Sequence, residues 1–216
     1  MSDRTQWFAA THRRSASWGR GYAHRHYPVA VKAAGVILAA GAGTRFGGPG
    51  EKLRTVFRGR PLVCWAIAPA LEAELDEVIV VSGSDDLQDV VPEGVTLLNN
   101  DAWELGQATS LGIALDWCQR QGHTAAVVGL GDTPGLTASA WRTVAETAGG
   151  PIVVATYGGK RGHPVRLDAA VWTLLPTSGD EGARSLMSRR PELVVEVACE
   201  GKAMDIDTRE DLRRWS

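Results

Sequence analysis

A glycine-rich segment that carries two cations is the first candidate for chemistry in this sequence. It extends from Gly41 to Lys52 and contains Gly43 and Arg45. Because glycine has no Cβ atom, backbone N–H groups in such a segment can approach phosphate oxygens closely and form an anion nest. Arg45 and Lys52 would neutralise the charge of a triphosphate. The segment is not a Walker motif, because no Gly-Lys-Ser or Gly-Lys-Thr sequence occurs in the chain.

Two aspartates in other parts of the chain are candidate metal ligands. Asp132 follows the apolar run 125–130 almost directly, and Asp207 precedes a C-terminal segment with a helical pattern. Mg²⁺ commonly takes one or two carboxylates from a protein and completes its coordination with phosphate oxygens and water. Either aspartate has an alternative interpretation as a turn or helix-cap residue. From spacing alone, a helix N-cap is the stronger prediction for Asp207.

Apolar segments that alternate with helical patterns must position these residues. The run 35–40 is continuously apolar, as expected of a strand that is buried on both faces of a sheet. Similar runs recur at Val78–Val81, Val95–Leu98, Ala125–Leu130, Ile152–Ala155 and Leu193–Val197. Most stretches between them read as helices, one of which starts near Pro61.

This alternation predicts an α/β fold with a doubly wound, mainly parallel, Rossmann-like sheet and helices on both faces. The turn at Gly158-Gly159 and the chain after it indicate a hairpin-like excursion from that pattern. We expect a single folded domain over residues 33–216. Because ligands in such sheets bind beyond the carboxyl ends of the strands, the glycine segment and Asp132 should lie at the binding edge.

Six short motifs, taken in their order along the chain, resemble one enzyme family. They are Leu38-Ala39-Ala40-Gly41-x-Gly43-x-Arg45-x-Gly47 with Lys52, Asn100-x-x-Trp103-x-x-Gly106-x-x-x-Ser110-Leu111, Leu130-Gly131-Asp132-x-Pro134, Gly162-His163-Pro164-Val165, Gly179-Asp180-x-Gly182-Ala183-Arg184 and Asp205-Ile206-Asp207-Thr208-x-Glu210-Asp211-Leu212. The series is similar to the nucleotidyltransferases of molybdenum-cofactor maturation, and most of all to their cytidylyltransferase branch. The resemblance covers about residues 34–216. Phe46, Gln107 and Arg209 depart from it, because Met, Met and Pro are typical at these places.

The resemblance implies roles for individual residues. The implied nucleotide-binding residues are Leu38, Ala39, Ala40, Gly41, Gly43, Arg45, Lys52, Gly106 and Ser110. Asp132 and Asp207 would hold Mg²⁺, and Arg45, Lys52 and Asp132 would be catalytic. The implied acceptor-binding residues are Gly162, His163, Pro164, Asp180 and Arg184. Leu-Ala-Ala-Gly at 38–41 is typical of the cytidylyl branch, whereas the guanylyl branch has Leu-Ala-Gly-Gly.

The reaction that the resemblance implies is transfer of CMP from MgCTP to the phosphate of molybdopterin, the organic part of the molybdenum cofactor, with release of pyrophosphate. A phosphate monoester has a second pKa near 6, so this nucleophile is already anionic at neutral pH and needs no general base. Catalysis then consists of aligning two anionic groups and neutralising their charge. A molybdoenzyme that receives the product is a possible further partner.

Three other functions stay open. The same chemistry could use GTP or another phosphorylated acceptor, such as a sugar phosphate. The chain could bind and deliver the cofactor without catalysis, because a fold can outlive its activity. A nicotinamide-dependent oxidoreductase could also use the glycine segment, although Asp85 is then an unconvincing choice for the acid that such sites place after the second strand.

Composition and charge exclude some classes of protein. Six of the 23 basic residues but only one of the 25 acidic ones lie in residues 1–32, which leaves 17 basic and 24 acidic residues in the rest of the chain. An acidic body argues against a nucleic-acid binder. Residues 1–32 lack periodicity and are expected to form a basic, disordered extension. No run of uncharged residues approaches the length needed to span a membrane, and no signal peptide is evident. The spacing of the three cysteines fits neither a zinc site nor a disulfide framework. We therefore expect a cytoplasmic protein.

Overall fold

A computed structural model of the chain describes residues 32–47, 52–202 and 204–215. Residues 1–31, and with them nearly all of the extension predicted from the sequence, lie outside the described residues. The same is true of residues 48–51 within the glycine segment.

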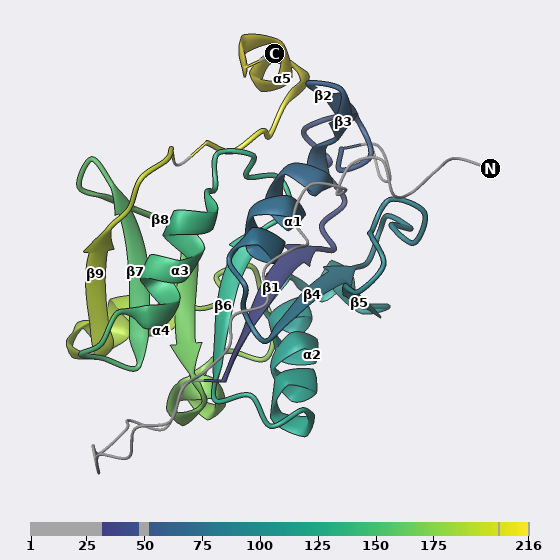
Figure 1. Cartoon of the computed structure of the whole chain (residues 1–216). Helices are drawn as coiled ribbons and strands as arrows, with labels where there is room; N and C mark the ends of the chain where they lie inside the picture. Colours follow the sequence, from purple (N-terminus) through teal and green to yellow (C-terminus); the bar gives the residue numbers. More distant parts are fainter. Residues whose placement is uncertain (1–31, 48–51, 203, 216) are drawn as a thin grey trace, which may run out of the picture.

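The described residues form a central sheet of seven strands with the order β5-β4-β1-β6-β8-β7-β9 (Figure 1). Its strands are β1 (Ala33–Ala39), β4 (Glu77–Ser82), β5 (Thr96–Asn99), β6 (Ala125–Leu130), β7 (Ile152–Tyr157), β8 (Lys160–Asp168) and β9 (Val194–Ala198). All neighbouring pairs are parallel except those that involve β8, which is antiparallel to both β6 and β7. The predicted doubly wound, mainly parallel sheet is therefore confirmed.

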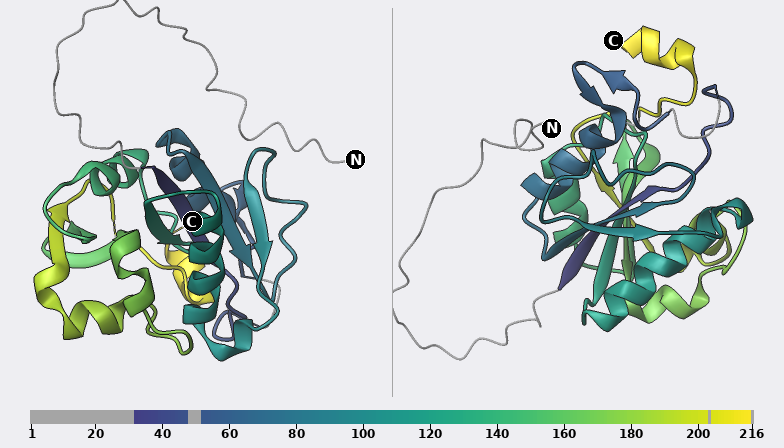
Figure 2. Two further views of the ribbon diagram at one scale, coloured as in Figure 1. Left: turned by 90° about the horizontal axis from the view of Figure 1, so that it is seen from below. Right: turned by 90° about the vertical axis from the view of Figure 1, so that its right-hand side faces the viewer.

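Helices connect the strands and cover both faces of the sheet (Figure 2). The α-helices are α1 (Leu62–Glu72), α2 (Gln107–Arg120), α3 (Ala138–Glu146), α4 (Arg184–Arg189) and α5 (Arg209–Trp215). Short 3₁₀ helices are η1 (Trp103–Leu105), η2 (Ala169–Leu174) and η3 (Pro191–Leu193). No helix in the described ranges is long and apolar enough to cross a membrane.

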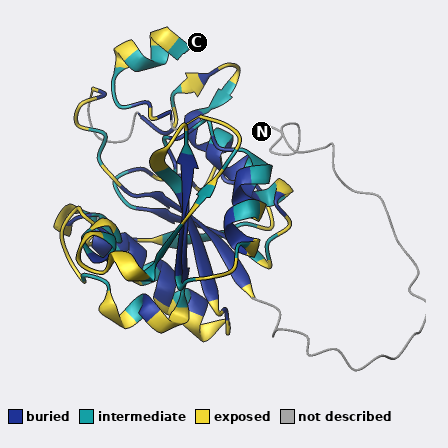
Figure 3. Ribbon diagram, turned by 90° about the vertical axis from the view of Figure 1, so that its left-hand side faces the viewer, coloured by how far each residue is buried: buried dark blue, intermediate teal, exposed yellow. Residues whose placement is uncertain are grey.

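The strands alternate their side chains between two apolar cores, which explains their continuously apolar sequences. In β1, Ile37 packs in the core under α1 and α3, whereas Val36 and Leu38 pack in the core under α2, η2 and α4. Every residue of β1 is buried. The strands β1, β4, β6 and β7 are accordingly almost entirely buried (Figure 3), whereas β5 and β9 at the two edges of the sheet are partly exposed.

A bulky side chain of α3 packs where the sheet has glycines. Trp141 is fully buried, and a Cβ atom at Gly129 in β6 would lie only 2.8 Å from its indole ring. A Cβ atom at Gly35 in β1 would lie 3.7 Å from the same ring. Because these two glycines have no side chains, the Trp141 ring can lie directly against the sheet and α3 can pack close to it.

Two hairpins interrupt the strand-helix alternation. The predicted excursion at Gly158-Gly159 is confirmed as the turn between β7 and β8, with positive φ angles of 58° and 79° at the two glycines. The second hairpin, β2 (Val56–Phe57) with β3 (Arg60–Pro61), is not predicted by the sequence analysis. It lies between the glycine segment and α1, so the first helix in the described part of the chain begins only after this hairpin.

Candidate functional site

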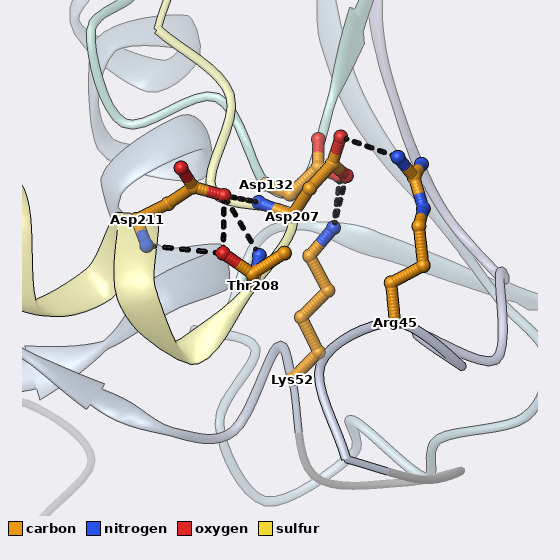
Figure 4. Close-up of polar contacts among 6 residues, drawn as sticks. All are labelled: Arg45, Lys52, Asp132, Asp207, Thr208 and Asp211. Atoms are coloured by element: carbon orange, nitrogen blue, oxygen red, sulfur yellow. Dashed lines mark hydrogen bonds and ion pairs between the residues drawn. The ribbon is translucent and has the colours of Figure 1, made fainter.

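Two cations and two carboxylates meet at the carboxyl end of the sheet (Figure 4). The Nζ atom of Lys52 lies 2.6 Å from Oδ2 of Asp132 and 3.1 Å from Oδ1 of Asp207. The Nη1 atom of Arg45 lies 3.2 Å from Oδ2 of Asp207. The structure thus brings together four residues that are up to 162 positions apart in the sequence, with Lys52 at the centre of the group.

The sheet register places Asp132 beside the glycine segment. Leu38 of β1 is paired with Leu130 of β6, and the Gly131 N–H donates to the Leu38 carbonyl at 2.9 Å. The two strands therefore end side by side, and the chain that follows each strand enters the same space. The segment before α5 joins them, because the Ile206 N–H donates to the Asp132 carbonyl at 3.0 Å.

Asp207 is not the N-cap of the terminal helix, which corrects the stronger of the two predictions from spacing. The cap is Thr208, whose Oγ1 accepts from the Asp211 N–H at 3.1 Å. In return, the Asp211 carboxylate accepts from the Thr208 N–H at 2.9 Å, which completes a capping box. Hydrogen bonds from Thr208 hold the pKa of Asp211 below its ordinary value. Since Thr208 and Asp211 cap the helix, the Asp207 carboxylate is available to Lys52 and Arg45.

Gly43 of the glycine segment leaves space for the side chain of Lys52. Gly43 has a φ of 60°, and a Cβ atom there would lie 2.9 Å from Cβ of Lys52. The lysine stem therefore crosses the loop at a point where only glycine fits. Apart from its chain neighbours, no described residue lies within 4 Å of the place where a Cβ atom of Gly41 would be.

The segment after β4 hydrogen-bonds to the glycine segment, a contact that the sequence does not predict. The Ser84 N–H donates to the Ala40 carbonyl at 3.1 Å, and the Ser84 hydroxyl lies 3.1 Å from the Gly41 carbonyl. A Cβ atom at Gly83 would lie 2.7 Å from Cβ of Ala40, so the two segments touch. The only available signal was the small residues at 82–84, which also occur in ordinary turns.

Three adjoining cavities follow the edge of the sheet from the lysine towards β8. The Lys52 cavity, about 220 Å³, is lined by Leu38, Ala39, Gly41, Gly43, Thr44, Arg45, Lys52, Leu53, Asp132 and Asp207. The Trp103 cavity, about 440 Å³, is lined by Ala40, Ser110, Trp103, Gln107 and Asp180 together with part of the glycine segment. The His163 cavity, about 230 Å³, is lined by Gly162, His163, Asp180 and Arg184 above apolar residues of the sheet.

Shared walls make these cavities one continuous cleft. Asp132 and Gly43 line both the Lys52 and the Trp103 cavity. Gln107 and Asp180 line both the Trp103 and the His163 cavity, and Leu38 lines all three. Most residues that the resemblance assigns to nucleotide or acceptor therefore line one cleft. The residues assigned to the nucleotide lie towards its Lys52 end, and those assigned to the acceptor lie towards its His163 end.

Gly106 and Pro164 are the two assigned residues that line none of these cavities. Gly106 instead contacts another loop: its φ is 104°, and a Cβ atom there would lie 2.4 Å from the carbonyl carbon of Gly179. The Ala108 N–H donates to the Gly179 carbonyl at 2.9 Å. Gly106 thus joins the start of α2 to the loop that carries Asp180, and a direct contact with a nucleotide stays a prediction.

The ring of His163 is held in one orientation. Its Nδ1 atom lies 3.2 Å from the Val128 carbonyl, which can only accept, so Nδ1 carries the proton. Burial lowers the pKa of His163 below its ordinary value, and it outweighs the hydrogen bond to the Val128 carbonyl and the carboxylates of Asp205 and Asp132, which raise this pKa. Burial and the nearby Asp132 carboxylate raise the pKa of Asp205. The neutral His163 ring therefore presents Nε2 as a hydrogen-bond acceptor.

The carboxylate pair fits a divalent cation that is shared with phosphate groups. The Oδ1 atom of Asp132 is buried and has no hydrogen-bond partner among the described residues, so it retains its capacity to coordinate a cation. No group of three or more His, Cys, Asp and Glu side chains in the described part of the chain is arranged to hold a metal ion. Two carboxylates with phosphate oxygens and water nevertheless satisfy the usual preferences of Mg²⁺.

Comparisons with known proteins agree with this architecture. A family model described as MobA-like NTP transferase domain matches residues 35–194. Nicotine blue oxidoreductase of Paenarthrobacter nicotinovorans is 33% identical over 196 residues, which cover 83% of this chain and 94% of that relative.

Among solved structures, Rv0371c from Mycobacterium tuberculosis H37Rv has a TM-score of 0.73 and 27% identity, covering 86% of this chain and 98% of the other. A complex of Rv0371c with manganese has a TM-score of 0.69 and 26% identity, covering 85% and 97%.

Proposed function

Because the chain belongs to the MobA-like NTP transferase domain family, we propose that it transfers a nucleotidyl group from a nucleoside triphosphate to a phosphorylated acceptor. The specific reaction that we propose is CMP transfer from CTP to the phosphate of molybdopterin, with pyrophosphate as the second product. The observation that carries the proposal is the cluster of Arg45, Lys52, Asp132 and Asp207 beside the glycine segment.

The cluster suits this reaction because the difficulty lies in charge repulsion. An oxygen of the acceptor phosphate attacks the α-phosphorus of the triphosphate, and the bond from that phosphorus to the pyrophosphate oxygen breaks, with the electron pair leaving on pyrophosphate. Lys52 and Arg45 neutralise the phosphate oxygens and hold the triphosphate along the glycine segment. No side chain has to remove a proton, because the attacking phosphate is already ionised at neutral pH.

Asp132 and Asp207 would hold a divalent metal ion. The bound ion would supply positive charge to the triphosphate and fix its orientation. Mg²⁺ is our choice because the ligands are carboxylate oxygens. The manganese complex of Rv0371c supports a divalent cation as a cofactor of this fold.

The other two cavities of the cleft support separate binding places for the nucleoside and the acceptor. The Trp103 cavity adjoins the glycine segment and suits the base and ribose, and the His163 cavity at its far side suits the acceptor. Ala40 lines the Trp103 cavity and favours cytosine over the larger guanine, although a single methyl group discriminates by only about 1 to 3 kcal/mol. A cytoplasmic location and a recipient molybdoenzyme remain predictions.

The proposal is tested by a nucleotide panel with the purified full chain. Pyrophosphate release is measured with CTP, GTP, ATP and UTP, each with Mg²⁺ and with or without molybdopterin. We expect release with CTP that requires both Mg²⁺ and molybdopterin. Release with GTP or with a sugar phosphate would change the substrate assignment, and cofactor binding without pyrophosphate release from any nucleotide would indicate a delivery protein.

A redox reaction is a second candidate, because the relative from Paenarthrobacter nicotinovorans is named an oxidoreductase. The local structure favours it less, since the glycine segment is followed by the β2–β3 hairpin and not by a helix whose N-terminus could hold a dinucleotide pyrophosphate. Binding of NADPH without Mg²⁺, together with reduction of a dye substrate, would support this candidate.

A further inference from the structure

The ammonium group of Lys52 contacts the same two carboxylates that are proposed to hold the metal ion. We propose that Lys52 is an internal counter-cation that keeps free divalent ions from Asp132 and Asp207, so that the metal ion enters only together with the nucleoside triphosphate. This inference concerns the regulation of the site and rests on the proposed function for its biological meaning.

The geometry shows how completely Lys52 engages the acids. Its Nζ atom is 2.6 Å from Asp132 and 3.1 Å from Asp207, so one ammonium group bridges both carboxylates. Its side chain is only 9% exposed, and its stem passes over Gly43, which fixes the direction of approach. Water and salt screen such partly buried ion pairs less than pairs on the open surface, so the ammonium group interacts more strongly with these carboxylates than a surface lysine would.

A divalent cation would compete directly with this ammonium group. It would need the two carboxylates whose charge Lys52 already neutralises, and it would bring charge of the same sign to within reach of the ammonium group. A free ion must therefore displace Lys52 into a position without a partner or bind beside it against electrostatic repulsion. Both outcomes weaken binding of the ion by itself.

A nucleoside triphosphate removes this obstacle. Its phosphate oxygens would offer the ammonium group new anionic partners at Gly41 and Gly43, which line the same cavity as the two carboxylates. The carboxylates are then available to the ion that accompanies the phosphates. Binding of nucleotide and binding of metal ion become mutually favourable, as reciprocal coupling of two ligands requires.

Arg45 contributes to the same effect more weakly. It lies 3.2 Å from Asp207, but its side chain is 74% exposed. Solvent and salt screen such an exposed charge, so its removal should change the affinity for a free cation much less than removal of Lys52.

The test measures Mn²⁺ binding to the full chain without nucleotide, using the electron paramagnetic resonance signal of unbound Mn²⁺. We expect Lys52→Met and Lys52→Gln to bind Mn²⁺ at least about tenfold more tightly than the unchanged chain. Lys52→Arg keeps the charge and should bind as weakly as the unchanged chain. Adding Asp132→Asn to Lys52→Met should abolish the gain.

Arg54→Met is the matched control for loss of a cation. Arg54 pairs with Asp89 at 2.5 Å but lines none of the three cavities, so its removal should leave Mn²⁺ affinity unchanged. Circular dichroism establishes that each variant is folded. Equal or weaker Mn²⁺ binding by folded Lys52→Met and Lys52→Gln would overturn the inference.

A second titration follows the coupling to nucleotide. CTP should raise Mn²⁺ affinity in the unchanged chain by a larger factor than in Lys52→Met, and equal factors would contradict the inference. The titrations without nucleotide involve no turnover. A chain that binds Mn²⁺ as expected but releases no pyrophosphate would therefore overturn the proposed function and leave the role of Lys52 as counter-cation intact.

Discussion

Each end of the central sheet carries a partly buried carboxylate, but the two carboxylates differ in how completely they are hydrogen-bonded. At the amino end of β4, the Glu77 carboxylate accepts from the Thr96 hydroxyl at 2.6 Å and from Trp117 Nε1 at 2.9 Å, and its second oxygen lies 2.7 Å from His123 Nε2. Just beyond the carboxyl end of β6, one oxygen of Asp132 contacts Lys52, and the other has no hydrogen-bond partner in the part of the chain that the structure describes. Each oxygen of Glu77 has a protein partner, whereas Asp132 keeps unused coordination capacity.

This difference separates a structural acid from a candidate functional one. Glu77 links β4, β5, α2 and the segment before β6, so its contacts hold elements together. Asp132 contacts a lysine within a solvent-accessible cleft, so its contacts can be exchanged for those of a ligand. Substitution of Asp132 should accordingly lower catalytic activity, whereas substitution of Glu77 should lower the stability of the fold.

The largest effect is expected at Asp132. Asp132→Asn removes the charge without changing the shape of the side chain, and we expect turnover at saturating Mg²⁺ to fall by at least about a thousandfold, as loss of a charged group at a reacting centre does. Steady-state pyrophosphate release measures the change. Asp116→Asn, at an exposed position of α2, is the control and should retain full activity. Near-normal turnover of Asp132→Asn would remove Asp132 from the metal site.

The second-largest effect is expected at Glu77, at the amino end of β4, where a substitution should lower the stability of the fold. Glu77→Ala leaves the donors of Thr96 and Trp117 without their charged acceptor, and we expect a loss of about 2 to 3 kcal/mol in the free energy of unfolding. Urea denaturation measures it, and kcat of the folded variant should stay within about twofold of the unchanged chain. A Glu77→Ala variant that is stable but inactive would contradict the assignment of Glu77 as a structural acid.

The same glutamate predicts a pH dependence. Burial alone would raise the pKa of Glu77, but hydrogen bonds from Thr96, His123 and Trp117 outweigh it and place the pKa below its ordinary value of 4.5. A lowered pKa in the folded state stabilises the fold fully above the unfolded-state value, and this contribution disappears as the pH falls through the folded-state pKa.

Urea denaturation of the unchanged chain and of Glu77→Gln over a pH series checks the sign. The unchanged chain should be more stable near neutral pH, and its advantage should shrink only below about pH 4.5. An advantage that grows towards acid pH would show that the folded-state pKa is raised and not lowered.

The smallest effect is expected at the support of the glycine segment. Ser84→Ala removes a hydroxyl that lies 3.1 Å from the Gly41 carbonyl and 3.0 Å from Oδ1 of Asp85, and whose single proton serves one of these acceptors at a time. The contact to the Gly41 carbonyl is worth about 1 kcal/mol. We expect the KM for the nucleotide to rise about fivefold with kcat and the KM for the acceptor unchanged. Ser139→Ala, in α3 and outside all three cavities, is the matched control. An equal change in both KM values would indicate general disturbance of the cleft.

Much of the fold was predictable because strands buried on both faces produce unmistakable apolar runs. The run 125–130 matches β6, and the glycine pair at 158–159 marks the β7–β8 turn. The β2–β3 hairpin escaped prediction because its strands of two residues each are too short to show periodicity.

The site was predictable as a set of residues but not as a set of contacts. Glycines beside cations and an acid after a strand indicate phosphate chemistry, yet spacing alone favoured Asp207 as a helix cap. The capping box of Thr208 and Asp211 decides this question, and it depends on the local geometry before α5. The bridge from Lys52 to two distant acids depends on how three separate segments fold together.

The most direct test of nucleotidyl transfer follows the α-phosphate. CTP labelled with ³²P at the α-position is incubated with the full chain, Mg²⁺ and molybdopterin, and both products are separated and quantified. The cleft described above predicts label in the acceptor product and one unlabelled pyrophosphate for each labelled product. Label that stays entirely in CTP, or that leaves as free CMP without entering the acceptor, would contradict it.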